Sequence, residues 1–431
     1  MTDPGLLKKH SEFKSYTTSR YTYPKIRVFF RKHPQHDKLP TEPAPLPLLV
    51  FIHGLGGSIA QFHPLLASLV NISGALAIDL PGAGLSDFAP KTWNAYTTDA
   101  LAELLAVIIE DYREKEAKQG VVLIGHSMGC SLAALIASKN STLSNALSEH
   151  VVGLVAVCPK ATPPSEQECA TFRKLLWIPG PVFNMWRKWD RRGGIESASV
   201  NRFVGADADL ETKKLQYRFN EQSKTEVWRR MASGSLPKYE NGVAKGGFPG
   251  EHVWAGLEVP VFLVAGEADN ITKPINIEEI AAFLGKSHPV QIEVDEDSNH
   301  ITGAAASVDT PMERHEHRGR NINTLSEEDF VEASLDTAED AHEDPSTPQD
   351  GLSIIPPQPA RPKKVLKTTI LPAPASHALL YQPATVRILA GLIADFLCTQ
   401  VSPRLSLGWQ LQFLSTSGTT AIDRDFPSNP S

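Results

Sequence analysis

The feature that most constrains this chain is a series of short apolar runs separated by longer segments of helical periodicity. The runs are LLVFI at 48–52, ALAIDL at 75–80, VVLIG at 121–125, VVGLVAV at 151–157 and VPVFLVAG at 259–266. A strand with one solvated face alternates apolar and polar residues, but these runs are apolar throughout, which indicates strands buried on both faces. Amphipathic helices are expected between them, at 96–118, 128–138 and 275–284. The pattern therefore predicts an α/β fold in which helices cover a mostly parallel sheet.

Two segments interrupt this alternation. Residues 160–250 lack a buried-strand pattern but contain helix-like stretches rich in Trp and Arg, FRKLLWIPGPVFNMWRKWDRR and KTEVWRRMASG. We expect a helical cap here, inserted after the sixth strand of the core. Its Trp and Arg side chains suit a lipid-facing lid, but side chains of this kind more often pack a cap onto a core, and that interpretation is favoured.

The second interruption, at 303–363, is acidic, rich in Pro and Ser and poor in aromatic residues. Such a segment buries too little apolar surface to offset its ordering entropy, so we expect a disordered, solvated insertion rather than a docking site. The predicted organisation is the first part of the core at 1–159, the cap at 160–250, the second part of the core at 251–302, the acidic insertion at 303–363, the final strand and helix of the core at 364–400 and a C-terminal tail at 401–431.

Composition and charge exclude several classes of protein. A hydrophobic fraction of 41% and a charged fraction of 21% give ample material for a globular core. The formal net charge of −7 argues against a nucleic-acid surface. No apolar run reaches the roughly 18 residues of a membrane span, and the N-terminus lacks the apolar stretch of a signal peptide. We expect a cytoplasmic protein; organelle import is the alternative, because residues 1–32 are basic and acid-poor, although 21–32 is also expected to form an opening strand.

The four cysteines are expected to be reduced structural thiols. They are Cys130, Cys158, Cys169 and Cys398. None has the close CxxC spacing of a zinc or redox site, and two lie in apolar runs where cysteine packs as a small hydrophobic residue.

The pentapeptide Gly125-His126-Ser127-Met128-Gly129 follows a predicted buried strand and opens a predicted helix. This is the context of a nucleophile elbow, in which a serine occupies a strained turn and the flanking glycines avoid collisions with the neighbouring strand and helix. Ser127 is therefore the candidate nucleophile.

A second glycine-rich loop, His53-Gly54-Leu55-Gly56-Gly57, follows the run at 48–52. A loop of this kind lets the backbone approach a substrate, so the N–H groups of Leu55 and Met128 are the candidate oxyanion-hole donors. The loop lacks the GxxxxGK[ST] and GxGxxG patterns, which disfavours nucleotide binding. No cofactor and no metal site is predicted.

The motifs HGLGG, DLPGAGLSD, GHSMG and AGEADNITKP, in this order, resemble the α/β-hydrolase superfamily, in the branch with a single inserted cap. The resemblance covers roughly residues 47–159 and 258–399. It implies that the acid of a catalytic triad follows the strand at 259–266, where Asp269 stands; Glu267 is the alternative. We interpret the DLPGAGLSD turn as structural.

The histidine has two candidates. His300 lies at a suitable distance after Asp269 but is followed by the acidic insertion. His377 ends the strand-like run VLKTTILPAPASH and precedes the apolar-periodic segment YQPATVRILAGLIADFL, an arrangement that resembles the end of the family's core. His377 is therefore the preferred base. Members similar to lipid acyltransferases place Asp five residues after this histidine; Gln382 stands there, which disfavours acyl transfer to an acceptor other than water.

The resemblance implies a serine hydrolase that acts on a carboxylic ester or thioester through a Ser-His-Asp triad and an acyl-enzyme, with the large cap suggesting a hydrophobic acyl or aryl group. A serine in place of the aspartate of epoxide hydrolases and dehalogenases disfavours those chemistries. The alternatives are a C–C bond hydrolase or cofactor-free haloperoxidase with the same triad, and a non-catalytic interaction protein that recruits a partner through its acidic insertion. The expected partner is a small ester or a lipid-like substrate, with peripheral membrane contact through the cap.

Overall fold

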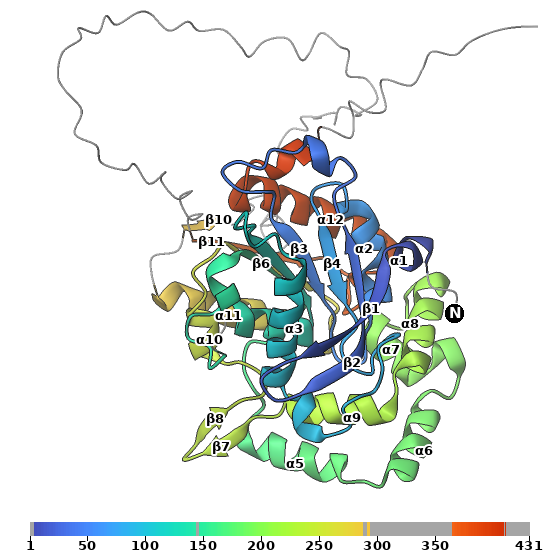
Figure 1. Cartoon of the computed structure of the whole chain (residues 1–431). Helices are drawn as coiled ribbons and strands as arrows, with labels where there is room; N and C mark the ends of the chain where they lie inside the picture. The colour runs from blue at the N-terminus through green and yellow to red at the C-terminus, as the bar shows by residue number, and fades with distance from the viewer. Residues whose placement is uncertain (1–3, 144–145, 288–290, 294–363, 409, 411–431) are drawn as a thin grey trace, which may run out of the picture. The chain divides into compact units, whose positions relative to one another are not determined.

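A single sheet organises the computed structural model, which describes residues 4–143, 146–287, 291–293, 364–408 and 410. Within these residues nine strands pair in the order β1-β2-β4-β3-β5-β6-β9-β11-β10 (Figure 1). Their bounds are β1 Ser11–Thr17, β2 Thr22–Arg31, β3 Leu48–Ile52, β4 Ala75–Ile78, β5 Val121–His126, β6 Val151–Val157, β9 Val261–Gly266, β10 Gln291–Glu293 and β11 Val365–Leu371. The pairs β1/β2 and β2/β4 are antiparallel and the other neighbouring pairs are parallel, which confirms the predicted mostly parallel sheet.

The central strands are buried on both faces, as their apolar sequences predict. In β3, Leu48, Val50 and Ile52 join one hydrophobic core, while Leu49 and Phe51 join the core on the opposite face. The first core is completed by helices α3 (Thr98–Tyr112), α4 (Met128–Ala137), α10 (Glu251–Ala255) and α11 (Ile275–Ser287). The second is completed by α1 (Gly5–Lys9), α2 (His63–Leu69) and α12 (Pro383–Phe396). The sheet is therefore the middle layer between two layers of helix.

The last helix has the length and composition of a membrane span. The helical segment Pro383–Val401, formed by α12 and a π-helical turn at Leu397–Val401, is the one helix of the described residues that passes this test. It packs against the sheet, with the ring of Phe396 centred 5.4 Å from that of Phe262 in β9. Its apolar residues thus contribute to the core.

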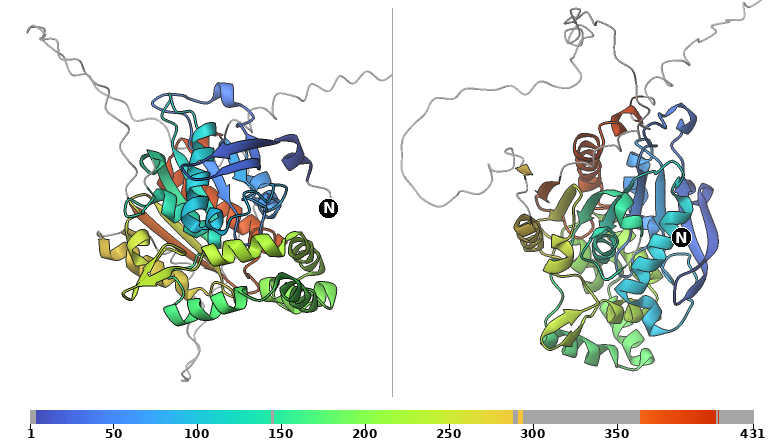
Figure 2. Two further views of the ribbon diagram at one scale, coloured as in Figure 1. Left: turned by 60° about the horizontal axis from the view of Figure 1, so that its bottom comes forward. Right: turned by 60° about the vertical axis from the view of Figure 1, so that its left-hand side comes forward.

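Between β6 and β9 the chain forms helices in the segment where the sequence predicts a cap. They are α5 (Glu166–Leu176), α6 (Gly180–Asp190), α7 (Ala198–Val204), α8 (Leu210–Gln222) and α9 (Thr225–Gly234), followed by the hairpin β7 (Lys238–Glu240) and β8 (Val243–Lys245). In both Figure 1 and the left view of Figure 2 these helices gather on one side of the core. The predicted acidic insertion lies outside the described residues.

The DLPGAGLSD turn after β4 braces the loop that follows β3. The buried carboxylate of Asp79 accepts hydrogen bonds from the N–H groups of Ile59 at 2.7 Å and Leu85 at 3.0 Å, and Arg27 Nη1 lies 3.6 Å away. A Cβ on Gly84, whose φ is +49°, would fall 2.2 Å from Asp79 Oδ2, so this close approach requires glycine. Asp79 therefore fixes the loop through backbone contacts.

Candidate active site

Ser127 occupies the turn between β5 and α4, as the GHSMG motif predicts. Its φ of 53° and ψ of −121° lie in a region that residues with a Cβ avoid, so the turn is strained. A Cβ on Gly125 would fall 2.6 Å from the backbone nitrogen of Cys130, and one on Gly129 would fall 2.0 Å from the carbonyl oxygen of Ile52. Because neither position accommodates a larger residue, the two glycines allow helix, strand and serine to meet this closely.

The glycine-rich loop after β3 lies against the nucleophile turn. A Cβ on Gly54 would fall 2.9 Å from Ser127 Cβ, so the backbone beside Leu55 approaches the serine directly. Met128 is the first residue of α4, where an N–H has no acceptor within its own helix. In the part of the chain that the structure describes, no hydrogen bond engages the N–H of Leu55 or of Met128. Both predicted oxyanion donors are therefore available.

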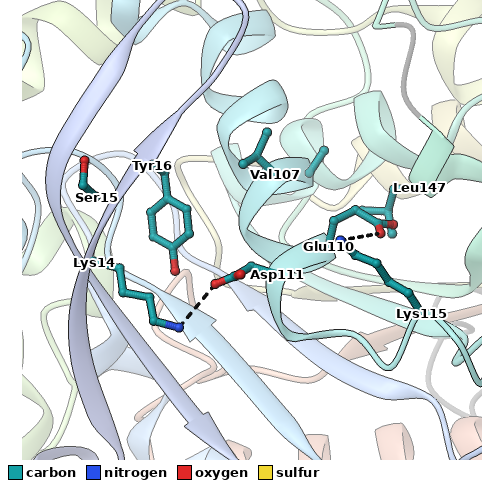
Figure 3. Close-up of a pocket in the computed structure, with 9 residues that line it drawn as sticks. Lys14, Ser15, Tyr16, Val107, Glu110, Asp111, Lys115 and Leu147 are labelled. Carbon is teal, nitrogen blue, oxygen red and sulfur yellow. Dashed lines mark hydrogen bonds and ion pairs between the residues drawn. The ribbon is translucent and has the colours of Figure 1, made fainter.

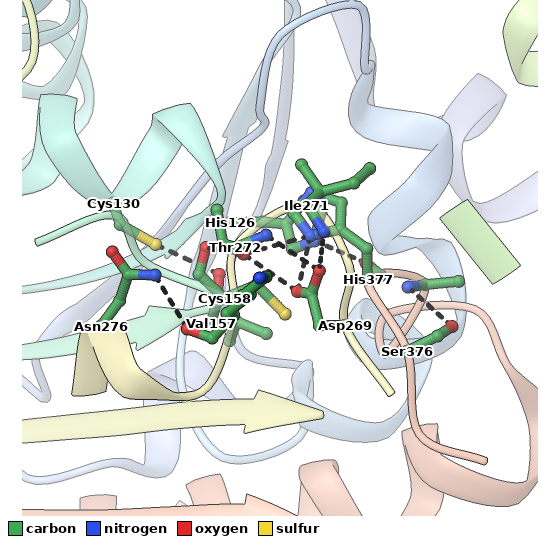
Figure 4. A network of polar contacts seen from close by, with 12 residues as sticks. His126, Cys130, Val157, Cys158, Asp269, Ile271, Thr272, Asn276, Ser376 and His377 are labelled. Carbon is green, nitrogen blue, oxygen red and sulfur yellow. Dashed lines mark hydrogen bonds and ion pairs between the residues drawn. The ribbon is translucent and has the colours of Figure 1, made fainter. Parts of the chain in front are cut away.

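His377 lies in the loop between β11 and α12 and is held by hydrogen bonds from three residues, of which Thr272 contributes Oγ1, 3.3 Å from His377 Nδ1 (Figure 4). Its Nδ1 is 2.8 Å from Asp269 Oδ2, with both side chains buried. Its carbonyl oxygen is 3.0 Å from Nε2 of His126, the residue before Ser127. Although 251 positions separate His126 from His377, this bond joins the histidine loop to the nucleophile turn.

Both oxygens of the Asp269 carboxylate are hydrogen bonded, by its own loop and by His377. Oδ1 accepts the N–H groups of Ile271 at 2.8 Å and Thr272 at 2.9 Å, while Oδ2 faces His377 and Thr272 Oγ1. Burial works against ionisation, but the hydrogen bond and charge of His377, together with the backbone N–H groups of Thr272 and Ile271, outweigh it and lower the pKa of Asp269 to about 2. Asp269 is therefore a carboxylate at neutral pH.

Three residues of this network were not predicted from the sequence. Thr272 Oγ1 lies 2.9 Å from Asp269 Oδ2 and 3.0 Å from the carbonyl oxygen of Cys158. Burial, reinforced by His377, lowers the pKa of His126 to about 3, so its ring is neutral and donates from Nε2. The position of Thr272 three residues after Asp269 is a recognisable signal for a side chain that closes a turn, but nothing local marks Cys158.

His126, Cys158 and His377 also form the group of the described residues whose geometry suits a metal, with ligand atoms within 4.8 Å of one another. A thiolate is the form of cysteine that binds metals. Burial and the neighbouring Asp269 carboxylate raise the pKa of Cys158 well above its ordinary value, so it is a neutral thiol. Because His377 Nδ1 is also engaged by Asp269, this cluster is better suited to a hydrogen-bonded network than to a metal.

The cap helices cover this site with aromatic side chains. The ring of Phe203 in α7 is centred 5.9 Å from that of His377. Trp228 in α9 approaches the glycine-rich loop, with Cδ1 3.4 Å from the position of a Cβ on Gly56. In α8, the ring of Phe219 is centred 5.1 Å from that of Tyr381, four residues after the histidine. Helices α7 and α8 thus contact the loop that holds His377, and α9 contacts the glycine-rich loop that holds Leu55.

The alternative acid and base have different surroundings. Glu267 is exposed, and its Oε2 accepts the N–H of Ala373 at 2.9 Å. That contact links the loop after β9 to the loop that holds His377, but Glu267 does not contact the imidazole ring that a triad acid must orient. His300 lies outside the described residues. Gln382 Nε2 donates to the carbonyl oxygen of Pro374 at 3.2 Å and so braces the loop of His377.

A surface groove elsewhere is unrelated to this site (Figure 3). It is lined by residues of β1 and the C-terminal half of α3, with Lys14 Nζ 3.3 Å from Asp111 Oδ2. Because α3 ends at Tyr112, shortly before β5 begins, the groove lies near the N-terminal ends of the parallel strands. Ser127, Asp269 and His377 all follow strand ends, at the opposite edge.

The chain is similar in sequence to one protein family and to several individual proteins. Residues 49–314 match the model of the alpha/beta hydrolase family. An abhydrolase domain-containing protein of Schizosaccharomyces pombe is 28% identical over 234 residues, which are 52% of this chain and 58% of the relative. Lipid droplet hydrolase 1 of Saccharomyces cerevisiae is 26% identical over 281 residues, 59% of this chain and 70% of the relative. A solved carboxylesterase of Bacillus subtilis superposes with a TM-score of 0.48 at 17% identity, covering 91% of this chain and 93% of that one.

Proposed function

Because this chain belongs to the alpha/beta hydrolase family, we propose that it is a serine hydrolase with Ser127 as nucleophile, His377 as general base and Asp269 as the acid that orients the histidine. The observation that carries this proposal is the 2.8 Å contact between His377 Nδ1 and Asp269 Oδ2, in a loop bonded to the residue before Ser127. A proton on Nδ1 leaves Nε2 free to accept the serine proton.

The reaction is acyl transfer to water. Ser127 Oγ attacks the carbonyl carbon while His377 Nε2 takes its proton, and the N–H groups of Leu55 and Met128 stabilise the oxyanion. His377 then gives this proton to the departing alcohol or thiol, which leaves an acyl-enzyme. Water, deprotonated by His377, attacks the acyl carbon, and the acid product leaves with Ser127 restored. No step needs a cofactor.

The proposed substrate is a carboxylic ester or thioester with a hydrophobic acyl or aryl group. The aromatic side chains of Phe203 and Trp228, which approach His377 and the loop of Leu55, support this preference. The name of one relative, lipid droplet hydrolase 1, points the same way. Gln382 stands where acyltransferase-like members have Asp, which favours water as the acceptor.

Ser127→Ala tests the nucleophile, because it removes only a hydroxyl. We expect fluorophosphonate labelling to disappear and turnover of a short-chain aryl ester to fall by roughly 10⁴-fold. Ser131→Ala is the matched control: Ser131 lies in the first turn of α4, which follows Ser127, and is buried with its hydroxyl unpartnered. Its loss should leave both measurements unchanged. Labelling of the Ser127 variant at the wild-type rate would exclude this nucleophile. A panel of esters, thioesters and a diketone separates ester hydrolysis from C–C bond cleavage.

A further inference from the structure

Helix α6 presents its apolar stripe to the outside. Val182, Met185, Trp186 and Trp189 are spaced i, i+3, i+4, i+7, the pattern by which a helix normally faces a core. Their side chains are 48%, 67%, 44% and 64% exposed, whereas Phe183, which borders the stripe on the helix surface, is buried. An outward stripe of this kind on a packed helix indicates a binding surface.

The end of α5 extends this stripe into a patch. Phe172, Leu175 and Trp177 are 50%, 39% and 87% exposed. With the α6 stripe they form what we call the cap patch: Phe172, Leu175, Trp177, Val182, Met185, Trp186 and Trp189. Among the described residues, seven of the seventeen exposed large hydrophobic side chains fall in this stretch. Both helices pack on α9, and the views of Figures 1 and 2 show them on the outside of the cap.

Positive charge surrounds the cap patch. Residues 173–192 hold six basic side chains and one acidic one, in a chain with a net charge of −7. Some of this charge is used internally, since Arg187 donates to the carbonyl oxygen of Ser223 and Arg191 to that of Asn220. Three other basic residues next to the cap patch are exposed and form no ion pair with the part of the chain that the structure describes: Lys174, Lys188 and Arg192.

We propose that the cap patch docks on the surface of an anionic phospholipid membrane. Tryptophan is favoured at the boundary between head groups and acyl chains, and Lys and Arg beside it pair with anionic head groups. A second copy of this chain is a poorer occupant, because a symmetric interface would bring two sets of the same cations together. The combination of exposed indole rings and unpaired cations therefore fits a lipid surface.

Aromatic contacts connect the cap patch to the glycine-rich loop beside Ser127. Phe183 contacts Trp186 of the patch and Trp228 of α9, with ring centroids 5.3 and 5.8 Å apart. Trp228 in turn lies against the loop at Gly56. A single layer of aromatic side chains thus lies between α6 and the glycine-rich loop that holds Leu55. Entry of an acyl substrate through this layer rests on the proposed function, whereas docking itself does not.

Co-sedimentation of the full chain with sucrose-loaded vesicles tests the docking. The vesicles are phosphatidylcholine alone, or phosphatidylcholine with an equal amount of phosphatidylserine. We expect the wild-type protein to bind the anionic vesicles more tightly. The combined variant Trp177→Ala, Met185→Ala, Trp189→Ala should bind at least about tenfold more weakly. Replacing Lys174 and Lys188 by Ser should reduce binding to the anionic vesicles by on the order of fivefold per cation.

The control is a variant with three exposed apolar side chains removed elsewhere: Val243→Ala, Ile370→Ala and Ile388→Ala, which lie on β8, β11 and α12 and are 60%, 42% and 54% exposed. It should bind as the wild-type protein does, and all variants should keep the wild-type melting temperature. Wild-type protein that stays in the supernatant, or a patch variant that sediments like the wild type, would overturn the proposal. A dimer in light scattering that the patch variant dissociates, without vesicle binding, would assign the surface to a second copy instead.

Discussion

The substitution Asp269→Asn tests the triad most sharply, because the two side chains have nearly the same volume. In the structure Oδ1 accepts two backbone N–H groups, those of Ile271 and Thr272, and Oδ2 faces His377 Nδ1. In the variant the amide oxygen must keep the two backbone N–H groups, because an amide NH₂ cannot accept them. The NH₂ group then points at His377, whose Nδ1 becomes an acceptor. The ring proton moves to Nε2, the nitrogen that must accept the proton of Ser127.

The wrong tautomer should cost roughly 10⁴-fold in kcat, about 5.5 kcal/mol of transition-state stabilisation. KM should change little, because Asp269 is 2% exposed and contacts the histidine rather than the substrate space. Initial rates with a short-chain aryl ester over a range of concentrations give both constants.

Glu267→Gln is the matched control. It makes the same carboxylate-to-amide change two residues away, where Oε2 only accepts the N–H of Ala373. Its kcat should stay within a few-fold of the wild-type value. Equal losses in the two variants, or a loss confined to Glu267→Gln, would refute the assignment of Asp269.

Asp269→Asn should also change how the stability of the fold depends on acid pH. Folding lowers the pKa of Asp269 from 3.8 to about 2. The folded state therefore holds this proton more weakly than the unfolded state, and the group contributes about 2 to 3 kcal/mol at neutral pH. That contribution is fully present above about pH 4 and is lost as the pH falls toward 2. Urea unfolding at several pH values should show the difference between wild type and Asp269→Asn shrinking over this range.

Other substitutions test the remaining assignments. His377→Ala should lower ester turnover by orders of magnitude and His300→Ala should cost little; an active His377→Ala beside an inactive His300→Ala would reverse the choice of base. Deleting residues 305–360 should leave melting temperature and turnover nearly unchanged, because this sequence is too polar and acidic to form a core; a large loss in a thermal scan would show that it supports the fold. Gly129→Ala should destabilise by more than about 2 kcal/mol, because its Cβ would fall 2.0 Å from a carbonyl oxygen of β3. In denaturant unfolding, Gly391→Ala in α12 is the control, since nothing lies within 4 Å of its Cβ position.

Burial on both faces made the central strands predictable. A strand between two helical layers must be apolar at every position, so β3 and β6 coincide with their apolar runs, Leu48–Ile52 and Val151–Val157. The edge strand β1, Ser11–Thr17, was not predicted because Tyr16 is its one buried residue. Its sequence therefore carries no continuous apolar signal, and only pairing with β2 defines it.

The candidate site was predictable where a residue sits at a strand end. Ser127 and Asp269 lie within three residues of the ends of β5 and β9, and parallel strands bring these ends to one edge of the sheet. The residues that contact Ser127 and Asp269 were harder to predict from the sequence. Cys158 reaches Asp269 because β6 and β9 are neighbours in the sheet, although β9 begins more than 100 residues later in the chain. Pairing of this kind depends on strand order, which no local pattern encodes.

The cap shows why periodicity alone does not assign function to a helix. The spacing of Val182, Met185, Trp186 and Trp189 defines an apolar face, and the favoured interpretation of the Trp-rich and Arg-rich sequence was packing onto the core. The Trp and Arg residues of the cap differ in their surroundings. Trp228 packs inward and Arg187 hydrogen bonds to the backbone of the cap, whereas the apolar stripe of α6 faces outward. A hydrophobic face lowers the free energy only against an apolar partner, and the sequence does not say which partner that is. Because α9 contacts α6 through Phe183, the described residues leave the outward face of α6 exposed, and in our proposal the membrane surface supplies its apolar partner.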